Sequence, residues 1–490
     1  TIARLVERAF ELSEASNTPV FMDLRIRACH VHGSFVAGAN RAPALSTRKL
    51  QADAATFDYE HIPHPPATYR QEKLKMGVRM PAARRYIREH KLNELFAGSE
   101  AGVGIICQGG LYNNLLRALK LVGLADDFGA SRIPILALNV VYPLVPEEIS
   151  AFCSDKTAVL VVEEGQPEFI EQDIATLLRR ADIQTRLHGK DVLIMAGEYT
   201  AEVIVHGLAR FLGTHAAHLD ISAGTRWYEA VDAVRARAAE LLGAPLPPRP
   251  PNFCVGCPER PVFAAIKLVE RAIGKRHISA DLGCHSFATF APFALGNSIL
   301  GYGMSLASSA GVAPMLAGRS MAIMGDGGFW HNGFLSGVAS NQLNGGDAVL
   351  LIMKNGYTSA TGTQELVSSP HDDSGELTHE KSAVFDDRTI ENTLRGAGVK
   401  WLRNVYTYRV ADMTKTLREA FTTEEPGLKV IIAEGECQLE RQRRIRPVLA
   451  RLLGSGARVT RTRFGVDDET CSGDHSCIRL SGCPTLTLKD

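Results

Sequence analysis

Two polar residues that each end an apolar run constrain this chain more than any other feature. Met321 to Met324 leads into Gly325-Asp326-Gly327, and Ala348 to Met353 leads into Lys354-Asn355. A helical stretch separates the two runs, so the pattern predicts a strand, a glycine-rich turn, a helix and a second strand. Both polar side chains should therefore lie at the carboxyl ends of parallel strands, where open α/β sheets bind their ligands.

One carboxylate and one amide at such an edge suit a single Mg²⁺ ion. Magnesium takes one or two carboxylates and fills its other positions with water and substrate phosphate oxygens, so the implied ligand is a diphosphate. A Gly-Asp-Gly sequence alone is more often a turn. The spacing from Asp326 to Asn355 and the flanking strands favour the metal site. The arrangement resembles the signature of the thiamine diphosphate enzymes, in which the carbonyl two residues after the Asn, here Tyr357, also binds the metal.

Cysteine spacing is the second signal. Cys254 and Cys257 form a Cys-x-x-Cys pair, Cys284 follows in a Gly-Cys turn, and Cys437 lies beyond Asn355. Four thiolates are enough for one zinc ion or one iron–sulfur cluster, and ten cysteines in 490 residues is too few for a disulfide scaffold. Zinc is the simpler interpretation of an isolated Cys-x-x-Cys pair. A thiamine site in the same domain favours iron, because electrons released by decarboxylation can then pass to a [4Fe-4S] cluster.

Together these motifs resemble the 2-oxoacid:ferredoxin oxidoreductases, and most closely their indolepyruvate branch. The segments that carry the resemblance occur in the family's order and are Cys254 to Pro258, Asp281 to Cys284, Gly325 to Gly333 and Thr361 to Gln364. Each is a modest motif alone, and their order and spacing make the set specific.

The resemblance implies which residues contact each cofactor. The expected ligands of the [4Fe-4S] cluster are Cys254, Cys257, Cys284 and Cys437, and those of Mg²⁺ are Asp326, Asn355 and the Tyr357 carbonyl. The expected contacts of thiamine diphosphate are Gly283, Gly303, Met304, Asp326, Gly327, Gly328, Asn355, Tyr357 and Thr358. His331, which opens the helix after the metal loop, is a candidate to polarise substrate or donate a proton. An ordinary helix-start histidine is the alternative.

The activity implied by the resemblance is oxidative decarboxylation of an aryl 2-oxo acid, such as indolepyruvate, to the acyl-CoA and CO₂, with ferredoxin as the electron acceptor. The resemblance also implies a further reductase domain or subunit, and a homodimer or higher oligomer. Two alternatives stay open. A non-redox thiamine diphosphate decarboxylase or carboligase has no use for four spaced cysteines, and an iron–sulfur electron-transfer subunit would keep the thiamine fold only as a scaffold.

Length and charge agree with a large cytoplasmic enzyme of the α/β class, with several domains and parallel sheets. At roughly 150 residues per domain, the length predicts about three domains. A formal net charge of zero argues against a nucleic-acid or membrane-surface partner. The uncharged stretch from Ser286 to Gly318 is long enough to span a membrane. Its glycines, serines and prolines instead favour a buried helix and loop beside a cofactor cleft.

Pattern, composition and resemblance suggest seven segments. They are the end of a pyrimidine-binding domain (1–35), an irregular linker (36–95), an α/β domain like the transketolase carboxyl-terminal domain (96–200), a helical segment with a Pro-rich linker (201–251), the diphosphate-binding domain (252–440), a basic linker helix (441–465) and a partial ferredoxin-like segment (466–490). We expect a helix at Ile2 to Ala15 and a strand at Pro19 to Leu24. The resemblance places the catalytic Glu of thiamine enzymes upstream of Thr1.

Further residues have plain structural interpretations. Glu163 and Glu164 are expected to form a solvated strand end with helix-capping character, and Cys29, Cys107 and Cys153 to be buried or incidental thiols. The arginines from Arg441 to Arg463 predict a solvated helix, with a docking face for an acidic ferredoxin as the alternative.

The tail resembles half of a bacterial ferredoxin. Cys471, Cys477 and Cys483-Pro484 follow the usual run, but Asp474 stands where the second cysteine belongs. An Asp-ligated [4Fe-4S] cluster, a [3Fe-4S] cluster and no cluster all remain open.

Overall fold

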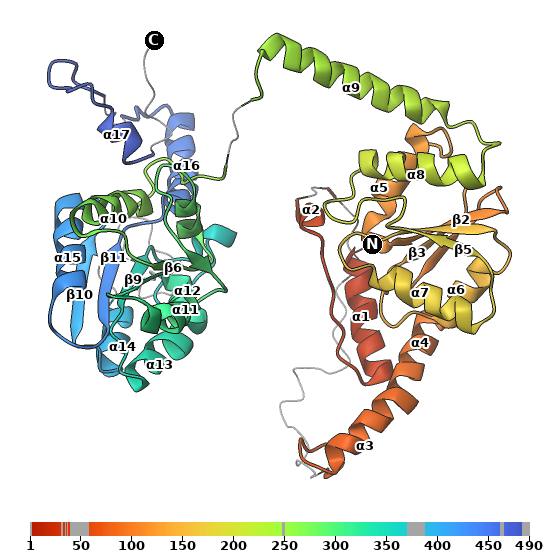
Figure 1. The fold of residues 1–490 in the computed structure, drawn as a ribbon, viewed down its shortest axis with the longest axis horizontal. Helices are drawn as coiled ribbons and strands as arrows, with labels where there is room; N and C mark the ends of the chain where they lie inside the picture. The colour runs from red at the N-terminus through yellow and green to blue at the C-terminus, as the bar shows by residue number, and fades with distance from the viewer. Residues whose placement is uncertain are drawn as a thin grey trace. The chain divides into compact units, whose positions relative to one another are not determined.

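The computed structural model describes residues 2–30, 33–34, 36, 38–39, 58–246, 250–369, 388–460 and 465–482. The chain forms two compact units, Thr1–Leu246 and Pro247–Asp490. Each unit is built on a largely parallel sheet with helices packed on it (Figure 1). The prediction of an α/β chain with parallel sheets is confirmed.

The first unit carries a five-stranded sheet in the order β1-β3-β2-β4-β5, in which only β1 runs antiparallel to its neighbour. Its strands are β1 (Glu94–Phe96), β2 (Val103–Gln108), β3 (Ile135–Leu138), β4 (Ala158–Val162) and β5 (Arg186–His188). Its helices are α1 (Ile2–Ser16), α2 (Ile26–Cys29), α3 (Ala67–Leu74), η1 (Lys75–Arg79), α4 (Met80–Glu89), η2 (Gly109–Leu111), α5 (Tyr112–Leu121), α6 (Pro146–Cys153), α7 (Phe169–Arg180), α8 (Ala201–His215) and α9 (Ser222–Leu242).

The second unit carries a six-stranded parallel sheet in the order β10-β11-β9-β8-β6-β7. Its strands are β6 (Ile278–Ala280), β7 (Ser298–Ile299), β8 (Met321–Gly325), β9 (Val349–Lys354), β10 (Trp401–Tyr406) and β11 (Lys429–Glu434). Its helices are α10 (Glu259–Ile273), η3 (Cys284–Thr289), α11 (Ser305–Val312), η4 (Ala313–Met315), α12 (Asp326–Gly328), η5 (Phe329–Ala339), α13 (Ser340–Leu343), η6 (Ser359–Thr361), α14 (Thr389–Gly396), α15 (Val410–Thr422), α16 (Gln438–Gly454) and α17 (Ser476–Arg479).

The central strands of the second unit are buried, with charged residues only at the ends of β9 and β11, because helices cover both faces of the sheet. Successive strand side chains point to opposite faces. Ile323 of β8 packs in one core with Phe263 of α10, and the next residue, Met324, packs in another core with Leu306 of α11. A parallel sheet covered on both sides requires such continuous apolar runs. This double burial fixes the ends of β8 and β9, where the candidate metal ligands lie.

The N-terminal predictions are partly right. The helix expected at Ile2 to Ala15 is confirmed as α1, but Pro19 to Leu24 is irregular and not a strand. The side chain of Phe21 in this segment is almost fully exposed. Residues with high strand propensity form a strand only where they can pair with a neighbouring strand and pack one face against the protein. This segment pairs with no strand in the described part of the chain.

The segment 36–95, expected to be an irregular linker, contains helices. A nearly continuous helical run extends from α3 through η1 to α4. In α4, Met80, Ala83 and Ile87 recur at helical spacing and are buried. The prediction failed because the prolines and histidines before Ala67 obscured this periodicity.

The alternating pattern after Gly102 is confirmed as β2, α5, β3, α6 and β4. At the end of β4, the Glu163 carboxylate accepts hydrogen bonds from the N–H groups of Ile170 (3.0 Å) and Glu171 (3.0 Å), which caps α7. The capping prediction is right. The predicted solvation is wrong for Glu163, which is only 5% exposed, because the cap itself is covered by the fold.

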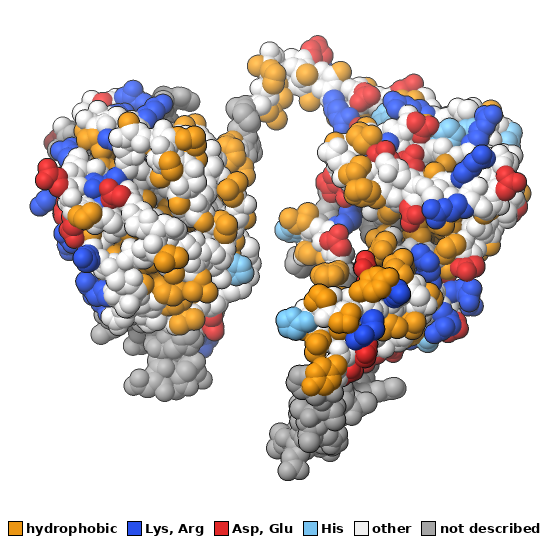
Figure 2. Space-filling view, turned by 60° about the horizontal axis from the view of Figure 1, so that its bottom comes forward, with side chains coloured by type: hydrophobic (Ala, Val, Ile, Leu, Met, Phe, Trp, Pro, Cys, Tyr) orange, Lys and Arg blue, Asp and Glu red, His pale blue; other side chains and the backbone are white. Residues whose placement is uncertain are grey.

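Charges of both signs are interspersed on the face of each unit drawn in Figure 2. In the described part of the chain, no helix is both long enough and apolar enough to cross a bilayer. The basic helix is confirmed as α16, which is largely exposed, and Arg444 within it pairs with Glu436. Arg461, Arg463 and Cys483 lie outside the described residues.

Candidate thiamine diphosphate and iron–sulfur site

Asp326 and Asn355 lie together at the carboxyl ends of two neighbouring strands, as the sequence predicts. Asp326 follows β8 and is 1% exposed, and Asn355 follows β9. The Asp326 carboxylate accepts the N–H groups of Gly327 (3.0 Å), Asn355 (2.9 Å) and Gly356 (2.6 Å). These three backbone donors hold the carboxylate in one orientation and join the two loops.

The other two expected metal ligands, Asn355 and the Tyr357 carbonyl, are joined through Ser359. The Ser359 hydroxyl is 2.9 Å from Oδ1 of Asn355 and 3.4 Å from the Tyr357 carbonyl oxygen. Oδ1 of Asn355 also accepts the Tyr357 N–H at 3.1 Å, so these hydrogen bonds hold the loop after β9 in one conformation. Oxygen ligands from a carboxylate, an amide and a carbonyl are the set that Mg²⁺ favours.

The electrostatics of Asp326 also suit a cation. Burial raises the pKa of its carboxyl from 3.8 to about 7, although the backbone donors of Gly356, Asn355 and Gly327 oppose this shift. A buried carboxylate without a counter-charge is costly. A bound divalent ion would remove that cost by favouring the ionised form.

Glycines line the approach to this carboxylate because nothing larger fits. A Cβ on Gly327 would lie 2.2 Å from the Tyr302 hydroxyl and 2.5 Å from Oγ1 of Thr358. Gly303 has a φ of +80°, and a Cβ there would lie 2.6 Å from the Gly328 carbonyl oxygen. The loop after β7 therefore packs against the backbone of the segment after β8, and the side chains of Tyr302 and Thr358 pack against Gly327.

Asp281 is a site residue that the sequence reasoning did not assign. It follows β6 and its carboxylate accepts the Gly303 N–H at 2.8 and 2.7 Å, which fixes the loop that carries Tyr302. Burial raises the pKa of Asp281 to about 6. The signal was present, since Asp281 also ends an apolar strand at the same edge of the sheet.

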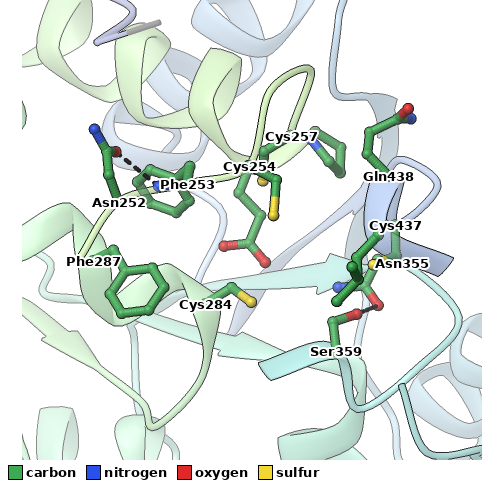
Figure 3. Close-up of a pocket in the computed structure, with 13 residues that line it drawn as sticks. Asn252, Phe253, Cys254, Cys257, Cys284, Phe287, Asn355, Ser359, Cys437 and Gln438 are labelled. Carbon is green, nitrogen blue, oxygen red and sulfur yellow. Dashed lines mark hydrogen bonds between the residues drawn. The ribbon is translucent and has the colours of Figure 1, made fainter. Parts of the chain in front are cut away.

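The four cysteines of the predicted cluster line one pocket, shown in Figure 3. Its empty volume is about 460 Å³, part of it open to solvent. The lining residues are Asn252, Phe253, Cys254, Cys257, Pro258, Glu259, Cys284, Phe287, Asn355, Ser359, Cys437, Gln438 and Leu439. Asn355 and Ser359 thus belong both to this cysteine pocket and to the candidate metal site.

Three separate segments supply these cysteines. Cys254 and Cys257 lie in the loop before α10, Cys284 begins η3, and Cys437 immediately precedes α16. Burial, followed by the charges of Glu259, Cys437 and Cys254, raises the pKa of the Cys284 thiol to about 12. Thiolates gathered in such a pocket need positive charge to remain ionised, and a metal or cluster provides it.

Among the described residues, no group of three or more Cys, His, Asp or Glu side chains is arranged to hold one metal ion.

Glu259, the first residue of α10, is a second side chain that sequence reasoning missed. It is buried, lines the cysteine pocket, and has a carboxyl pKa raised to about 8 by burial and then by the charge of Asp326. No local pattern in the sequence shows that a glutamate after Pro258 is buried.

The remaining predicted residues have varied positions. Thr358 shares a hydrogen bond of 3.3 Å with Tyr302, and Met304 accepts one from Asn332 through its sulfur. His331 is exposed, with its ring centroid 5.1 Å from that of Tyr302. Gly283 packs against the ring of His285, where a Cβ would be 2.6 Å from Cε1. Cys471 and Cys477 are exposed tail residues.

Comparisons with known proteins agree with this geometry. Residues 281–432 match the family model for the C-terminal TPP binding domain of thiamine pyrophosphate enzymes. The chain is 26% identical over 502 residues to the indolepyruvate oxidoreductase subunit IorA of Methanothermobacter thermautotrophicus, covering 100% of this chain and 71% of the relative. It is 28% identical over 481 residues to the same-named subunit of Archaeoglobus fulgidus, covering 97% and 68%.

A solved 2-oxoglutarate:ferredoxin oxidoreductase from Magnetococcus marinus aligns with 40% of this chain and 70% of its own, at 15% identity. The TM-score of this alignment is 0.32.

Residues 281–432, which carry most of the parallel sheet and the loops after β8 and β9, therefore resemble the thiamine diphosphate-binding domain of thiamine pyrophosphate enzymes. Over nearly its full length, the chain is similar to the indolepyruvate oxidoreductase subunits. The resemblance to the indolepyruvate branch of the 2-oxoacid:ferredoxin oxidoreductases, predicted from the motifs, is confirmed.

Proposed function

We propose that the chain catalyses thiamine diphosphate-dependent oxidative decarboxylation of an aryl 2-oxo acid, such as indolepyruvate, to the acyl-CoA and CO₂. Electrons would leave through a [4Fe-4S] cluster to ferredoxin. The observation that carries the proposal is the shared wall of two sites, since Asn355 and Ser359 line the cysteine pocket and also bound the candidate metal site. The names of the relatives support the substrate class.

The chain's residues would hold the diphosphate through a metal ion. The Asp326 carboxylate, Oδ1 of Asn355 and the Tyr357 carbonyl would bind Mg²⁺, which in turn binds phosphate oxygens. Gly327 and Gly328 lie in α12, where the absence of side chains would let their backbone approach phosphate oxygens, and the Gly327 N–H itself donates to Asp326. Asp281 contributes by fixing the Gly303 loop over this turn.

When bound, thiamine diphosphate supplies the electron sink for decarboxylation, and the cluster accepts single electrons. Asp326 is buried and would keep water away from the diphosphate, whereas His331, whose ring packs beside that of Tyr302, is exposed. His331 is exposed there and would donate a proton to, or polarise, the bound 2-oxo acid.

Cys254, Cys257, Cys284 and Cys437 would each bind one iron of the cluster. Their common pocket supports this assignment. Because the relatives are named as subunits, we extend the proposal to a partner subunit with the reductase domain. We also propose a dimer or higher oligomer.

The test is to add indolepyruvate, thiamine diphosphate, Mg²⁺ and CoA to the anaerobically purified chain with its partner subunit, and to record EPR spectra. We expect a reduced-cluster signal that requires the 2-oxo acid. Cys284→Ser should abolish the signal, whereas Cys107→Ser, a buried thiol of the first unit, should leave it intact. Release of CO₂ with no cluster signal would instead indicate a non-redox decarboxylase.

A further inference from the structure

A buried arginine beside the cysteine pocket lacks an anion. Arg260 is the second residue of α10 and is 4% exposed. Its Nη2 donates a 2.9 Å hydrogen bond to the carbonyl of Cys254, the first predicted cluster ligand. Its Nε and Nη1 have no hydrogen-bond partner in the part of the chain that the structure describes.

An unpaired guanidinium in a protein interior is strongly unfavourable. The penalty for a buried ion is several kcal/mol unless an opposite charge and hydrogen bonds compensate. The adjacent Glu259 does not compensate, because its Oε2 is also unpartnered among the described residues. Arg cannot escape the penalty by losing its proton, so the fold around Arg260 calls for a further anion.

The proposed cluster is an anion that would compensate the charge of Arg260. Four thiolates around an iron–sulfide core make an assembly that is anionic when oxidised and more anionic when reduced, and nearby charges and hydrogen bonds set its reduction potential. Arg260 is tied to the backbone of the loop that carries two of the four thiolates. Its Nη2 therefore lies 2.9 Å from the backbone of a loop that lines the cluster pocket.

We propose that Arg260 is a positioning residue that supplies the counter-charge of the cluster, holding the Cys254 loop in place and raising the reduction potential. The inference rests on the proposed function. In the step itself, one electron enters the cluster, and its donor is the 2-oxo acid being oxidised. No bond to Arg260 forms or breaks, and the positive charge favours the reduced state by Coulomb attraction.

The experiment compares Arg260→Gln and Arg260→Lys in the full chain, purified without oxygen. Arg271→Gln is the matched control, because Arg271 is an exposed residue in the last turn of the same helix. Iron and sulfide content is measured first, and the midpoint potential is then measured by dithionite titration followed by EPR. At the wild-type midpoint, we expect the reduced-to-oxidised ratio to fall at least tenfold in R260Q, equivalent to 59 mV. R260K should stay within threefold, and R271Q should match wild type.

Two results would overturn the inference alone. One is a loaded R260Q chain with the midpoint of R271Q. The other is an equal effect of R260Q and R260K, including equal loss of the cluster, because Lys keeps the charge. Cluster retained in R260K and lost in R260Q supports the inference. A wild-type chain without iron and sulfide overturns the proposed function together with this inference.

Discussion

Replacing Asp326 by Asn in the metal-free chain should change how the stability of the second unit depends on pH. The folded state raises the pKa of this carboxyl from 3.8 to about 7 by burial, so it holds the proton more tightly than the unfolded state does. The stabilisation from the protonated group is complete below the unfolded pKa. It is lost as the pH rises toward 7, because the unfolded state ionises first.

The size of the effect follows from the shift. One pKa unit corresponds to about 1.4 kcal/mol, so the full loss is about 4 kcal/mol, and about 2 kcal/mol of it falls between pH 5.5 and pH 8. Asn cannot ionise, so the stability of D326N should not fall in this way as the pH rises. The hydrogen bonds that Asn fails to accept from Gly327, Asn355 and Gly356 cost the same at both pH values and cancel from the comparison.

Tryptophan fluorescence can isolate the relevant unit. Of the three tryptophans, Trp227 lies in α9 of the first unit, and Trp330 and Trp401 lie in the second. Urea unfolding of metal-free W227F and W227F/D326N at pH 5.5 and pH 8 gives four free energies. We expect the free energy of unfolding of W227F/D326N, relative to that of W227F, to be about 2 kcal/mol higher at pH 8 than at pH 5.5.

W227F/D412N is the control, because Asp412 is an exposed residue of α15 in the same unit. Its free energy should follow that of W227F at both pH values. If D326N also follows W227F, Asp326 does not carry a strongly raised pKa, and the argument that it calls for a cation is refuted.

Three further substitutions test other parts of the account. Gly327→Ala should reduce thiamine diphosphate affinity at least tenfold in calorimetry, because the new methyl would meet the Tyr302 hydroxyl, whereas Gly311→Ala, with no atom within 4 Å, should bind normally. Unchanged affinity in G327A would show that the turn accommodates a methyl group beside the Tyr302 hydroxyl. Glu163→Ala should lower the urea stability of the first unit by about 1–2 kcal/mol, measured by circular dichroism, through loss of the α7 cap; no change would show that the cap is redundant. His331→Gln should lower kcat by about 100-fold with cofactor affinity unchanged. An unaltered kcat would show that His331 neither donates a proton to the 2-oxo acid nor polarises it.

The sequence predicts the centre of the fold because burial on both sides of a parallel sheet leaves a strong local pattern. The apolar runs before Asp326 and Asn355 are continuous, so the strands and their ends follow from residues adjacent in the sequence. The grouping of Cys437 with Cys254 is different, since almost two hundred positions separate them. Only the family resemblance predicted that they would share a pocket.

Residues whose role depends on tertiary burial were not predictable in this way. Glu259 and Arg260 look like ordinary first-turn helix residues, and only the packing of α10 against the sheet makes them buried charges. The opposite error occurred at Pro19 to Leu24, where strand-forming residues have no partner strand among those described. Local propensity and tertiary context disagree at each of these places.

Iron, zinc and acid-labile sulfide in the anaerobically purified chain, measured with EPR before and after dithionite, show whether the cysteine pocket holds a cluster. We expect about four irons and four sulfides from the pocket of Cys254, Cys257, Cys284 and Cys437, with a reduced-cluster signal. Cys284→Ser should lose that signal, and Cys153→Ser, a buried thiol of the first unit, should keep it. Stoichiometric zinc without sulfide would contradict the electron-transfer mechanism and leave a thiamine diphosphate decarboxylase as the function to test.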